Sequence, residues 1–372
     1  MSNSGQTRRD FVSDYLFEYY QKAVFSIPSL NKREFGVGRL KKIDSRHLSF
    51  ASETEFRAYL ASNLPPFVSH STSYYDFPGA TPMEKKIRTG ADLVFDLDLH
   101  SETKYGVYEM LGKVKEDLTR LVKDFVIGDF GVKKENVVVV FSGNRGYHVH
   151  VREKEWLGTG SDERKELVDY ILGHGLDYTA FFTPGEKGRL MGPKPSEGGY
   201  RGRLARAVVR TATENPSAIS RIFKQTPRRD LFIKSIENGN WSGSSFDNKD
   251  LLAKIKGVAA ELPISSVDTD AGVTYDLSKL IRVPNSIHGD TGMIAKIVPL
   301  DGLESFEPLR DAFFMRTGNG EIKKLKITFS EDVPAIGILG QTAGPFVKGQ
   351  TAELEEPVAI FFVLRKSAVF VS

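Results

Sequence analysis

One segment, residues 91–99, limits the possible folds of this chain more than any other. Its large apolar residues fall at every second position, and the positions between them hold Asp92, Val94, Asp96 and Asp98. A period of two is typical of a β-strand whose two faces meet different surroundings. The segment therefore predicts a strand with one apolar face and one acidic face.

Asp96 and Asp98 stand two positions apart on this predicted strand, so their carboxylates project from one face, about 7 Å apart at Cα. Two neighbouring anions are unfavourable unless a positive group neutralises them, and hard divalent cations are a common solution. Such ions could activate an attacking hydroxyl and stabilise a leaving pyrophosphate. Ordinary exposed strands also carry acids at this spacing, so the pair by itself leaves both interpretations open.

The rest of the chain mixes helical and strand-like patterns, which predicts the α/β (α+β) class. Apolar residues at helical spacing predict helices over 10–24 and 107–125. Strand-like segments occupy 136–141, 148–151, 280–283, 294–298, 326–329 and 358–364. Between 155 and 262 the pattern is mostly helical with Pro- and Gly-rich breaks, which predicts an inserted helical subdomain.

A second group of functional side chains lies in the turn of a predicted hairpin, residues 141–148, FSGNRGYH. Its glycines let the backbone turn tightly, and Ser142, Arg145 and His148 offer donors that suit phosphate oxygens. A plain hairpin turn with a solvated arginine would use the same glycines. His150, on the same strand face, is interpreted as a structural or supporting histidine.

A third group is the segment 280–292, LIRVPNSIHGDTG. Arg282 leaves a predicted strand, a proline ends the strand pairing, and His288 follows in a loop that glycines keep flexible. Upstream, the candidates for a third metal carboxylate are Asp268, Asp270 and Asp276. Taken alone, each of these acids is more simply explained as a turn residue.

Positive charge is concentrated in residues 185–234. This segment holds twelve Lys and Arg against four acids, a local charge of +8, whereas the whole chain carries only +3. A solvated face and a surface for nucleic-acid phosphates both explain the excess. The candidate phosphate contacts are Arg201, Arg203, Arg206, Arg228 and Arg229.

The composition excludes several classes of site and protein. With no cysteine, the chain has no disulfides, thiol nucleophiles, Cys-based zinc sites or ligands for an iron–sulfur cluster. The longest apolar run, 358–364, is too short to cross a bilayer, and no apolar stretch follows the polar first ten residues. We therefore expect a cytoplasmic protein without a membrane partner.

Together, the three segments resemble the small, catalytic subunit of the archaeal and eukaryotic DNA primases. LVFDLD at 93–98 is similar to the metal motif of that family, SGNRGYH at 142–148 to its nucleotide motif, and LIRVPNSIHG at 280–289 to its third motif. REFG at 33–36, with Arg46 beyond it, resembles the first block of the family. Order and spacing agree from about residue 10 to 300, and the C-terminal part matches only loosely.

The resemblance implies roles for individual residues. Asp96, Asp98 and Asp270 would be the catalytic carboxylates and would bind two Mg²⁺ or Mn²⁺ ions. The triphosphate of the incoming nucleotide would contact a larger set, which comprises Arg46, Ser142, Gly143, Arg145, His148, Arg282 and His288. Asn144 stands where many relatives have a second arginine, and the Cys/His zinc motif common after the acidic strand is missing, so we expect no zinc.

The resemblance also implies a fold and a function. Residues 1–154 and 263–372 would form a catalytic core of mixed sheets flanked by helices, with 155–262 inserted. The activity would be synthesis of short RNA primers on single-stranded DNA from nucleoside triphosphates, beside a large subunit that carries the iron–sulfur cluster. Two alternatives stay open: a repair or translesion primase-polymerase that extends DNA ends, and a catalytically silent nucleic-acid-binding scaffold of a replication complex.

Overall fold

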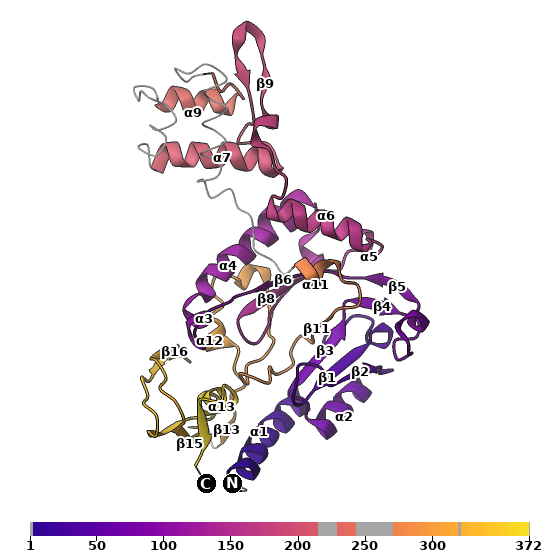
Figure 1. Ribbon diagram of the computed structural model, residues 1–372, viewed down its shortest axis with the longest axis vertical. Coiled ribbons are helices and arrows are strands. Elements are labelled where there is room, and N and C mark those ends of the chain that lie inside the picture. Colours follow the sequence, from indigo (N-terminus) through magenta and orange to yellow (C-terminus); the bar gives the residue numbers. More distant parts are fainter. Residues whose placement is uncertain (1–2, 215–228, 243–270, 319–320, 372) are drawn as a thin grey trace. The chain divides into compact units, whose positions relative to one another are not determined.

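The computed structural model describes residues 3–214, 229–242, 271–318 and 321–371 (Figure 1). The chain divides into two compact units. The first comprises residues 1–118, 133–165 and 269–372, and the second comprises 119–132 and 166–268. The insertion that the sequence predicts, 155–262, overlaps the second unit, which also takes in 119–132.

A four-stranded sheet in the first unit contains the acidic strand. Its order is β12-β7-β8-β6, and every pair is antiparallel. The strands are β6 (Leu93–Asp98), β7 (Val137–Phe141), β8 (Gly146–Val151) and β12 (Ile297–Val298). The predicted strand at 91–99 and the predicted hairpin that follows it are both confirmed.

The alternation in β6 separates the two faces of this sheet. Leu93, Phe95 and Leu97 are buried on one face, and their removal from water stabilises the strand. The register sets Asp96 opposite His148 and Asp98 opposite Gly146. Directly opposed residues share a face, so β6 and β8 present their polar side chains together.

A second antiparallel sheet joins segments that are far apart in the sequence. Its order is β11-β3-β1-β2. The strands are β1 (Phe35–Gly38), β2 (Ser45–Leu48), β3 (Phe67–Ser71) and β11 (Leu280–Arg282). A cluster of Val94, Val273 and Ile281 links the two sheets, and the His70 and His150 rings lie 6.3 Å apart between them.

The first helix, α1 (Asn3–Lys22), contacts the loop that follows β11. The Tyr19 hydroxyl donates to the Asn285 carbonyl at 2.7 Å, and the Tyr15 hydroxyl donates to the Gly292 carbonyl at 3.2 Å. The predicted helix at 10–24 is confirmed, although it begins earlier. Its buried tyrosines therefore hold the third functional segment in place.

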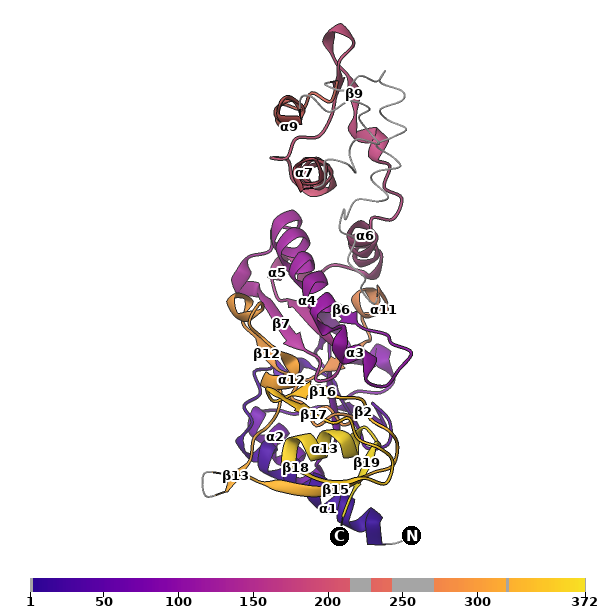
Figure 2. The same cartoon turned by 90° about the vertical axis from the view of Figure 1, so that its left-hand side faces the viewer.

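The strand expected at 358–364 is wrong, because these residues belong to α13 (Glu356–Leu364). The helix is buried on all sides from 356 to 363, so no polar face gives it a helical period. It lies against β15 (Lys324–Phe329), β18 (Thr351–Glu355) and β19 (Ala368–Phe370), as Figure 2 shows. A short apolar run of this kind fits a buried strand equally well.

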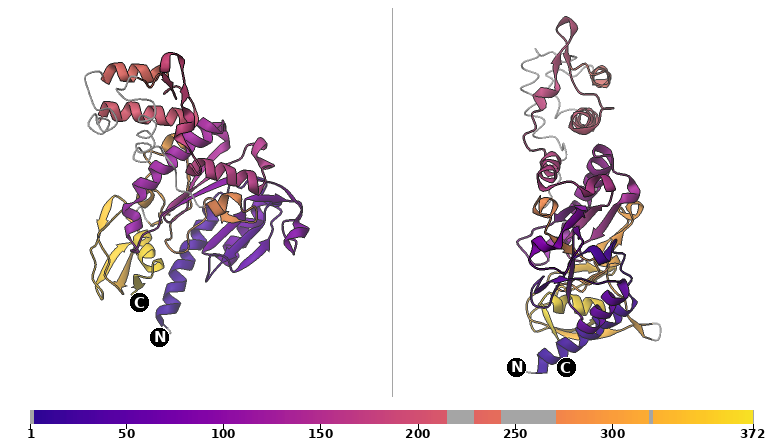
Figure 3. Two further views of the ribbon diagram at one scale, coloured as in Figure 1. Left: turned by 45° about the horizontal axis from the view of Figure 1, so that its top comes forward. Right: turned by 90° about the vertical axis from the view of Figure 1, so that its right-hand side faces the viewer.

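The second unit is mainly helical. It contains the π-helix η3 (Leu121–Asp129), α7 (Gly199–Glu214), α9 (Arg229–Glu237) and the short pair β9 (Thr183–Pro184) and β10 (Leu190–Met191). Helices α7 and α9 lie side by side (Figure 3). The predicted helix at 107–125 is divided among α3 (Gly106–Glu109), α4 (Leu111–Arg120) and η3.

The remaining elements connect or flank those described above. They are η1 (Leu30–Lys32), α2 (Glu53–Asn63), β4 (Ser73–Tyr75), η2 (Met83–Lys86), β5 (Arg88–Ala91), η4 (Lys134–Asn136), α5 (Lys154–Leu157), α6 (Ser161–Leu172), η5 (Tyr178–Phe181), η6 (Glu186–Gly188), α11 (Ala271–Tyr275), η7 (Leu300–Gly302), α12 (Pro308–Asp311), β13 (Thr317–Gly318), β14 (Glu321–Ile322), β16 (Ile336–Ile338) and β17 (Gln341–Ala343). Within the described ranges, no helix has the length and apolar character needed to span a membrane.

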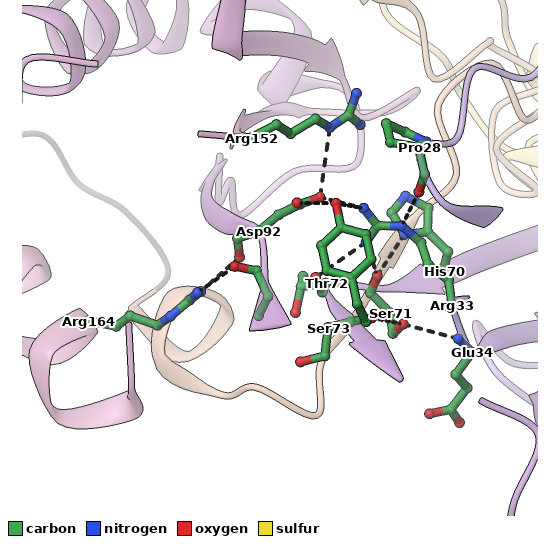
Figure 4. A network of polar contacts seen from close by, with 12 residues as sticks. Pro28, Arg33, Glu34, His70, Ser71, Thr72, Ser73, Asp92, Arg152 and Arg164 are labelled. Carbon is green, nitrogen blue, oxygen red and sulfur yellow. Dashed lines mark hydrogen bonds and ion pairs between the residues drawn. The ribbon is translucent and has the colours of Figure 1, made fainter. Parts of the chain in front are cut away.

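A buried ion pair stands directly before the acidic strand (Figure 4). Arg33 Nη2 lies 2.7 Å from Asp92 Oδ2, and both side chains are 0% exposed. The Tyr74 hydroxyl donates to Asp92 Oδ1 at 2.6 Å, and Arg33 Nη1 donates to the Ser71 carbonyl at 2.7 Å. Asp92, expected on an acidic strand face, is instead part of the core.

Arg164 binds the backbone at Asp92 and its neighbour. Its guanidinium donates to the carbonyls of Asp92, Ala91 and Thr159 at 2.8, 2.9 and 3.0 Å. The Ala91 and Asp92 carbonyls lie in the core, where a carbonyl without a hydrogen-bond partner is costly. Arg33 and Arg164 thus fix the chain just before β6.

We predict that Arg33→Met lowers the free energy of unfolding by about 3–5 kcal/mol, because it removes the nearer, hydrogen-bonded counter-ion of the buried Asp92 carboxylate and leaves Arg152, whose Nε lies 3.7 Å away. The neighbouring Lys32→Met is the matched control, since Lys32 and Asp76 form an exposed pair with 43% and 41% exposed side chains. That control should lose less than about 1 kcal/mol. Denaturant unfolding of both variants measures the difference, and equal losses would contradict the prediction.

Candidate active site

Asp96 and Asp98 lie at the end of β6 and differ in their contacts. Asp98, with a side chain 30% exposed, accepts two parallel hydrogen bonds from Arg145, from Nε to Oδ1 at 2.9 Å and from Nη2 to Oδ2 at 2.7 Å. Asp96, 18% exposed, has its Oδ1 3.6 Å from His148 Nε2. The structure therefore brings four predicted site residues together on adjacent strands.

The turn between β7 and β8 is closed by Ser142. Its Oγ accepts the Gly146 N–H at 3.2 Å, and its own N–H donates to the Gly146 carbonyl at 2.9 Å. Gly143 has φ +83°, and a Cβ there would stand 2.8 Å from the Cβ of His288. Only glycine fits this close approach, so the turn requires it.

The loop after β11 packs directly on this turn. The Thr291 hydroxyl donates to the Gly143 carbonyl at 2.6 Å, and the Asp290 N–H donates to His288 Nδ1 at 3.2 Å. The His288 ring lies 5.8 Å from that of Phe67, and the Arg282 guanidinium lies 5.5 Å from the same ring. The second and third functional segments thus form one site.

The histidines of this site are neutral near physiological pH. Burial lowers the pKa of His148 to about 3 and moves the pKa of His288 well below its usual value, and the Arg282 charge adds to both shifts. Because His288 Nδ1 accepts a hydrogen bond, we assign its proton to Nε2. Within the described part of the chain, His148 Nδ1 is buried without a hydrogen-bond partner.

Arg282 carries a buried positive charge. Burial lowers its pKa to about 10, so the guanidinium is still charged at neutral pH. Its Nη1 is buried and has no hydrogen-bond partner among the residues that the structure describes. A buried donor in this state is costly unless a ligand satisfies it, and an anion suits it best.

Arg46 belongs to a different group of contacts. Its Nε donates to Oε1 of the buried Glu34 at 3.0 Å, and its Nη2 donates to the Ser278 carbonyl at 3.2 Å. His47 and Lys86 also approach the Glu34 carboxylate, at 3.1 and 3.7 Å. Arg46 therefore compensates a buried acid on the second sheet.

The two carboxylates of β6 supply oxygen ligands of the kind that hard divalent cations prefer. Asp276 is described, and its Oδ1 accepts from the Ser278 N–H at 2.9 Å, as a turn residue does. Asp268 and Asp270 lie outside the described residues. In the part of the chain that is described, no three His, Asp or Glu side chains are grouped for a metal ion.

The candidate template contacts lie in the second unit. Arg203 is buried, bonded to Asp129, with its guanidinium 4.0 Å from the Phe125 ring centre. These contacts make Arg203 a packing residue between α7 and η3 and leave its guanidinium buried, away from any template strand. Arg201 pairs with Glu197 at 2.6 Å.

The remaining template candidates are Arg206, Arg228 and Arg229. Arg206 is exposed, and its Nη1 donates to the Pro195 and Glu197 carbonyls at 2.8 and 3.0 Å. Arg229 opens α9, and Arg228 lies outside the described residues. For all but Arg203, a role in template binding stays a prediction.

Two contributors to the site escaped the sequence analysis. The Phe67 ring contacts both Arg282 and His288. Phe67 comes from β3 and belongs to none of the sequence motifs, so nothing in the sequence pointed to its role. Thr291 holds the Gly143 carbonyl, and its place in the loop sequence GDTG was the available signal. Both act through contacts between segments far apart in the chain.

Comparisons with known proteins show the family to which this chain belongs. A family model described as "DNA primase small subunit" matches residues 95–299. The chain is 33% identical to "DNA primase small subunit PriS" of Methanococcoides burtonii, over 95% of this chain and 96% of the relative. It is also 33% identical to the proteins of that name from Methanothrix thermoacetophila, over 94% and 95%, and Thermoplasma volcanium, over 82% and 83%.

Among solved structures, "Polymerase Domain from Mycobacterium tuberculosis Ligase D in complex with DNA" aligns with 80% of this chain and 82% of its own, at 13% identity and a TM-score of 0.30. A score this low carries no argument. The family model, in contrast, spans more than half of the chain, and relatives one-third identical cover nearly all of it. The resemblance seen in the motifs is therefore confirmed, and the chain belongs to the DNA primase small subunit family.

Proposed function

We propose that this chain is the catalytic subunit of a DNA primase, which makes short RNA primers on single-stranded DNA in the cytoplasm from nucleoside triphosphates. The observation that carries the proposal is the contact between the Gly143 turn and the loop of His288 and Thr291, beside Asp96 and Asp98. It unites an acidic pair with donors for phosphate in one site.

The carboxylates Asp96 and Asp98, with Asp270 as a third, would bind two Mg²⁺ or Mn²⁺ ions. When bound, such ions lower the pKa of an attacking 3′-hydroxyl and neutralise charge on a leaving pyrophosphate. Neither Asp96 nor Asp98 is fully buried, so both are accessible to a ligand. No protein nucleophile takes part in this scheme.

The protein's own donors would bind the triphosphate. Asp98 holds the Arg145 guanidinium in one orientation through two hydrogen bonds. The remaining N–H groups of this guanidinium are thereby preorganised to bind a phosphate. Ser142 Oγ accepts from a backbone N–H, so its hydroxyl proton is available to an anion. His288 Nε2 and Arg282 Nη1 supply further donors, and their geometry exists before the ligand arrives.

The partners would be the template strand and a large primase subunit. Since this chain has no cysteine, any iron–sulfur cluster must be carried by that subunit. Starting a primer requires two nucleotides to be held at once, which is entropically costly, whereas the residues here describe one triphosphate site. We expect the isolated chain to extend primers better than it starts them.

We predict that Asp96→Asn or Asp98→Asn abolishes most nucleotide incorporation on unprimed single-stranded DNA, by at least about 100-fold, because a charge used in the transition state is lost. Folding should persist, since removing one of two like charges relieves repulsion. Asp76→Asn, at an exposed pair, is the control. Labelled-nucleotide assays with Mg²⁺ or Mn²⁺ measure the effect.

The same assay separates the alternatives. Formation of dinucleotides on unprimed template supports a primase, while extension restricted to existing ends indicates a repair or translesion polymerase. A wild-type protein that binds DNA and incorporates no nucleotide with either metal would be a scaffold. Normal synthesis by the Asp96/Asp98 double variant would refute the metal assignment.

We predict that Arg282→Met raises the KM for nucleotide by about 10-fold, as expected for a lost hydrogen bond to a charged group. Stability should be unchanged or higher, because the variant removes a half-buried charge whose Nη1 has no hydrogen-bond partner among the described residues. Arg164→Met is the matched control, since that buried arginine satisfies three carbonyls and its loss should destabilise the fold. Steady-state kinetics and thermal unfolding distinguish the two variants.

We predict that Arg206→Gln weakens binding of single-stranded DNA and reduces the slope of log affinity against log salt, if the exposed face of α7 meets the template. Arg203→Gln should instead destabilise the fold, because it unpairs the nearly buried Asp129. Anisotropy titrations at several salt concentrations measure the slope. An unchanged slope for Arg206→Gln would indicate that this segment is a solvated face that does not contact the template.

A further inference from the structure

The loop between β1 and β2, residues 39–44, folds back over one face of the second sheet. A Cβ at Gly38 would stand 2.7 Å from the Lys42 carbonyl group and even closer to the Lys41 carbonyl oxygen. The Asp44 carboxylate accepts three backbone N–H groups of the loop, at 2.6, 2.8 and 3.4 Å. These contacts fix the course of the loop against the sheet.

This loop leaves the sheet beside two residues of the candidate site. Gly38 lies directly opposite Phe67, so the space above Gly38 is on the face that carries the Phe67 ring. That ring contacts both the Arg282 guanidinium and the His288 imidazole. Lys42 therefore belongs to the same face as the phosphate donors of the third segment.

The charge of Lys42 reaches the two site histidines. Burial is the main cause that lowers the pKa of His148 and of His288, followed by the Arg282 charge, and the Lys42 charge contributes to both shifts. Lys42 is exposed and forms no ion pair or hydrogen bond within the described ranges. Its neighbour Lys41 is also exposed, but its charge lowers the pKa of Asp44.

We propose that Lys42 is a further contact for the triphosphate of the incoming nucleotide. The inference rests on the proposed function and adds a residue that none of the three motifs contains. Arg145 and Arg46 are already paired with carboxylates, whereas Arg282 and Lys42 present positive charge to the site without one. Arg282 and Lys42 repel each other, whereas a triphosphate bound between them attracts both side chains.

Both nucleotide and template carry phosphates, so either could meet an exposed lysine. The nucleotide is favoured because the Lys42 backbone covers Gly38 on the face of Phe67, and the Phe67 ring contacts Arg282 and His288 of the candidate site. Lys42 is exposed while Arg282 is half-buried with its Nη1 shielded from solvent, so the lysine meets the part of the triphosphate nearest to solvent.

The test compares Lys42→Ala with Lys41→Ala and Lys42→Arg in the full chain. Three quantities are measured: the affinity for ATP with Mg²⁺ by equilibrium titration, the KM and kcat of incorporation, and the affinity for single-stranded DNA. We expect Lys42→Ala to weaken ATP binding and raise KM by about 10-fold with little change in kcat. Lys41→Ala should match the wild type, and Lys42→Arg should restore most of the loss.

Salt provides a second readout, because an exposed lysine is screened within about 8 Å at physiological ionic strength. The difference in ATP affinity between the wild type and Lys42→Ala should therefore shrink as salt rises. Unchanged ATP affinity in Lys42→Ala, or a loss confined to DNA affinity, would overturn the inference while leaving the proposed function standing. A wild type that binds ATP but incorporates none would overturn only the function, and failure to bind ATP would overturn both.

Discussion

The ion pair between Arg33 and Asp92 is the interaction on which the arrangement of the first unit depends. Burying two charges is unfavourable unless their geometry is good and their remaining donors and acceptors are satisfied. Here the Tyr74 hydroxyl and the Ser71 and Pro28 carbonyls supply those partners. The pair ties the start of β6 to the second sheet. Asp96 follows four residues later on a strand, so its position is determined from this fixed point.

Electrostatic balance explains how the site can exist before its ligands bind. The Asp98 carboxylate is compensated by Arg145, and burial keeps His148 and His288 neutral, so few net charges remain close together. The uncompensated guanidinium of Arg282 is then the strongest attraction for an anion. Because these groups are held by packed strands and by the Gly143 turn, little reorganisation accompanies binding.

The sequence was sufficient for features that depend on local pattern. Alternation located β6, and the glycines located the β7–β8 turn, because both follow from short-range geometry. The strand expected at 358–364 failed because a helix buried on every side has no amphipathic period. The burial of Asp92 and Arg203 could not be read from the chain, since a lone charged residue gives no sign of a distant counter-ion. Lys42 and Phe67 escaped for the same reason: their neighbours come from other strands.

The position of β11 has a consequence for how the chain folds during synthesis. This strand pairs with the edge of β3, although the two are separated in the sequence by the whole second unit. At about 5–20 residues per second, roughly 10–40 s pass between the synthesis of β3 and that of β11. During this interval β3 presents an unpaired edge, which is a template for wrong pairing with other chains. A chaperone would therefore protect this protein most in the interval when the N-terminal sheet has formed and β11 has not yet been synthesised.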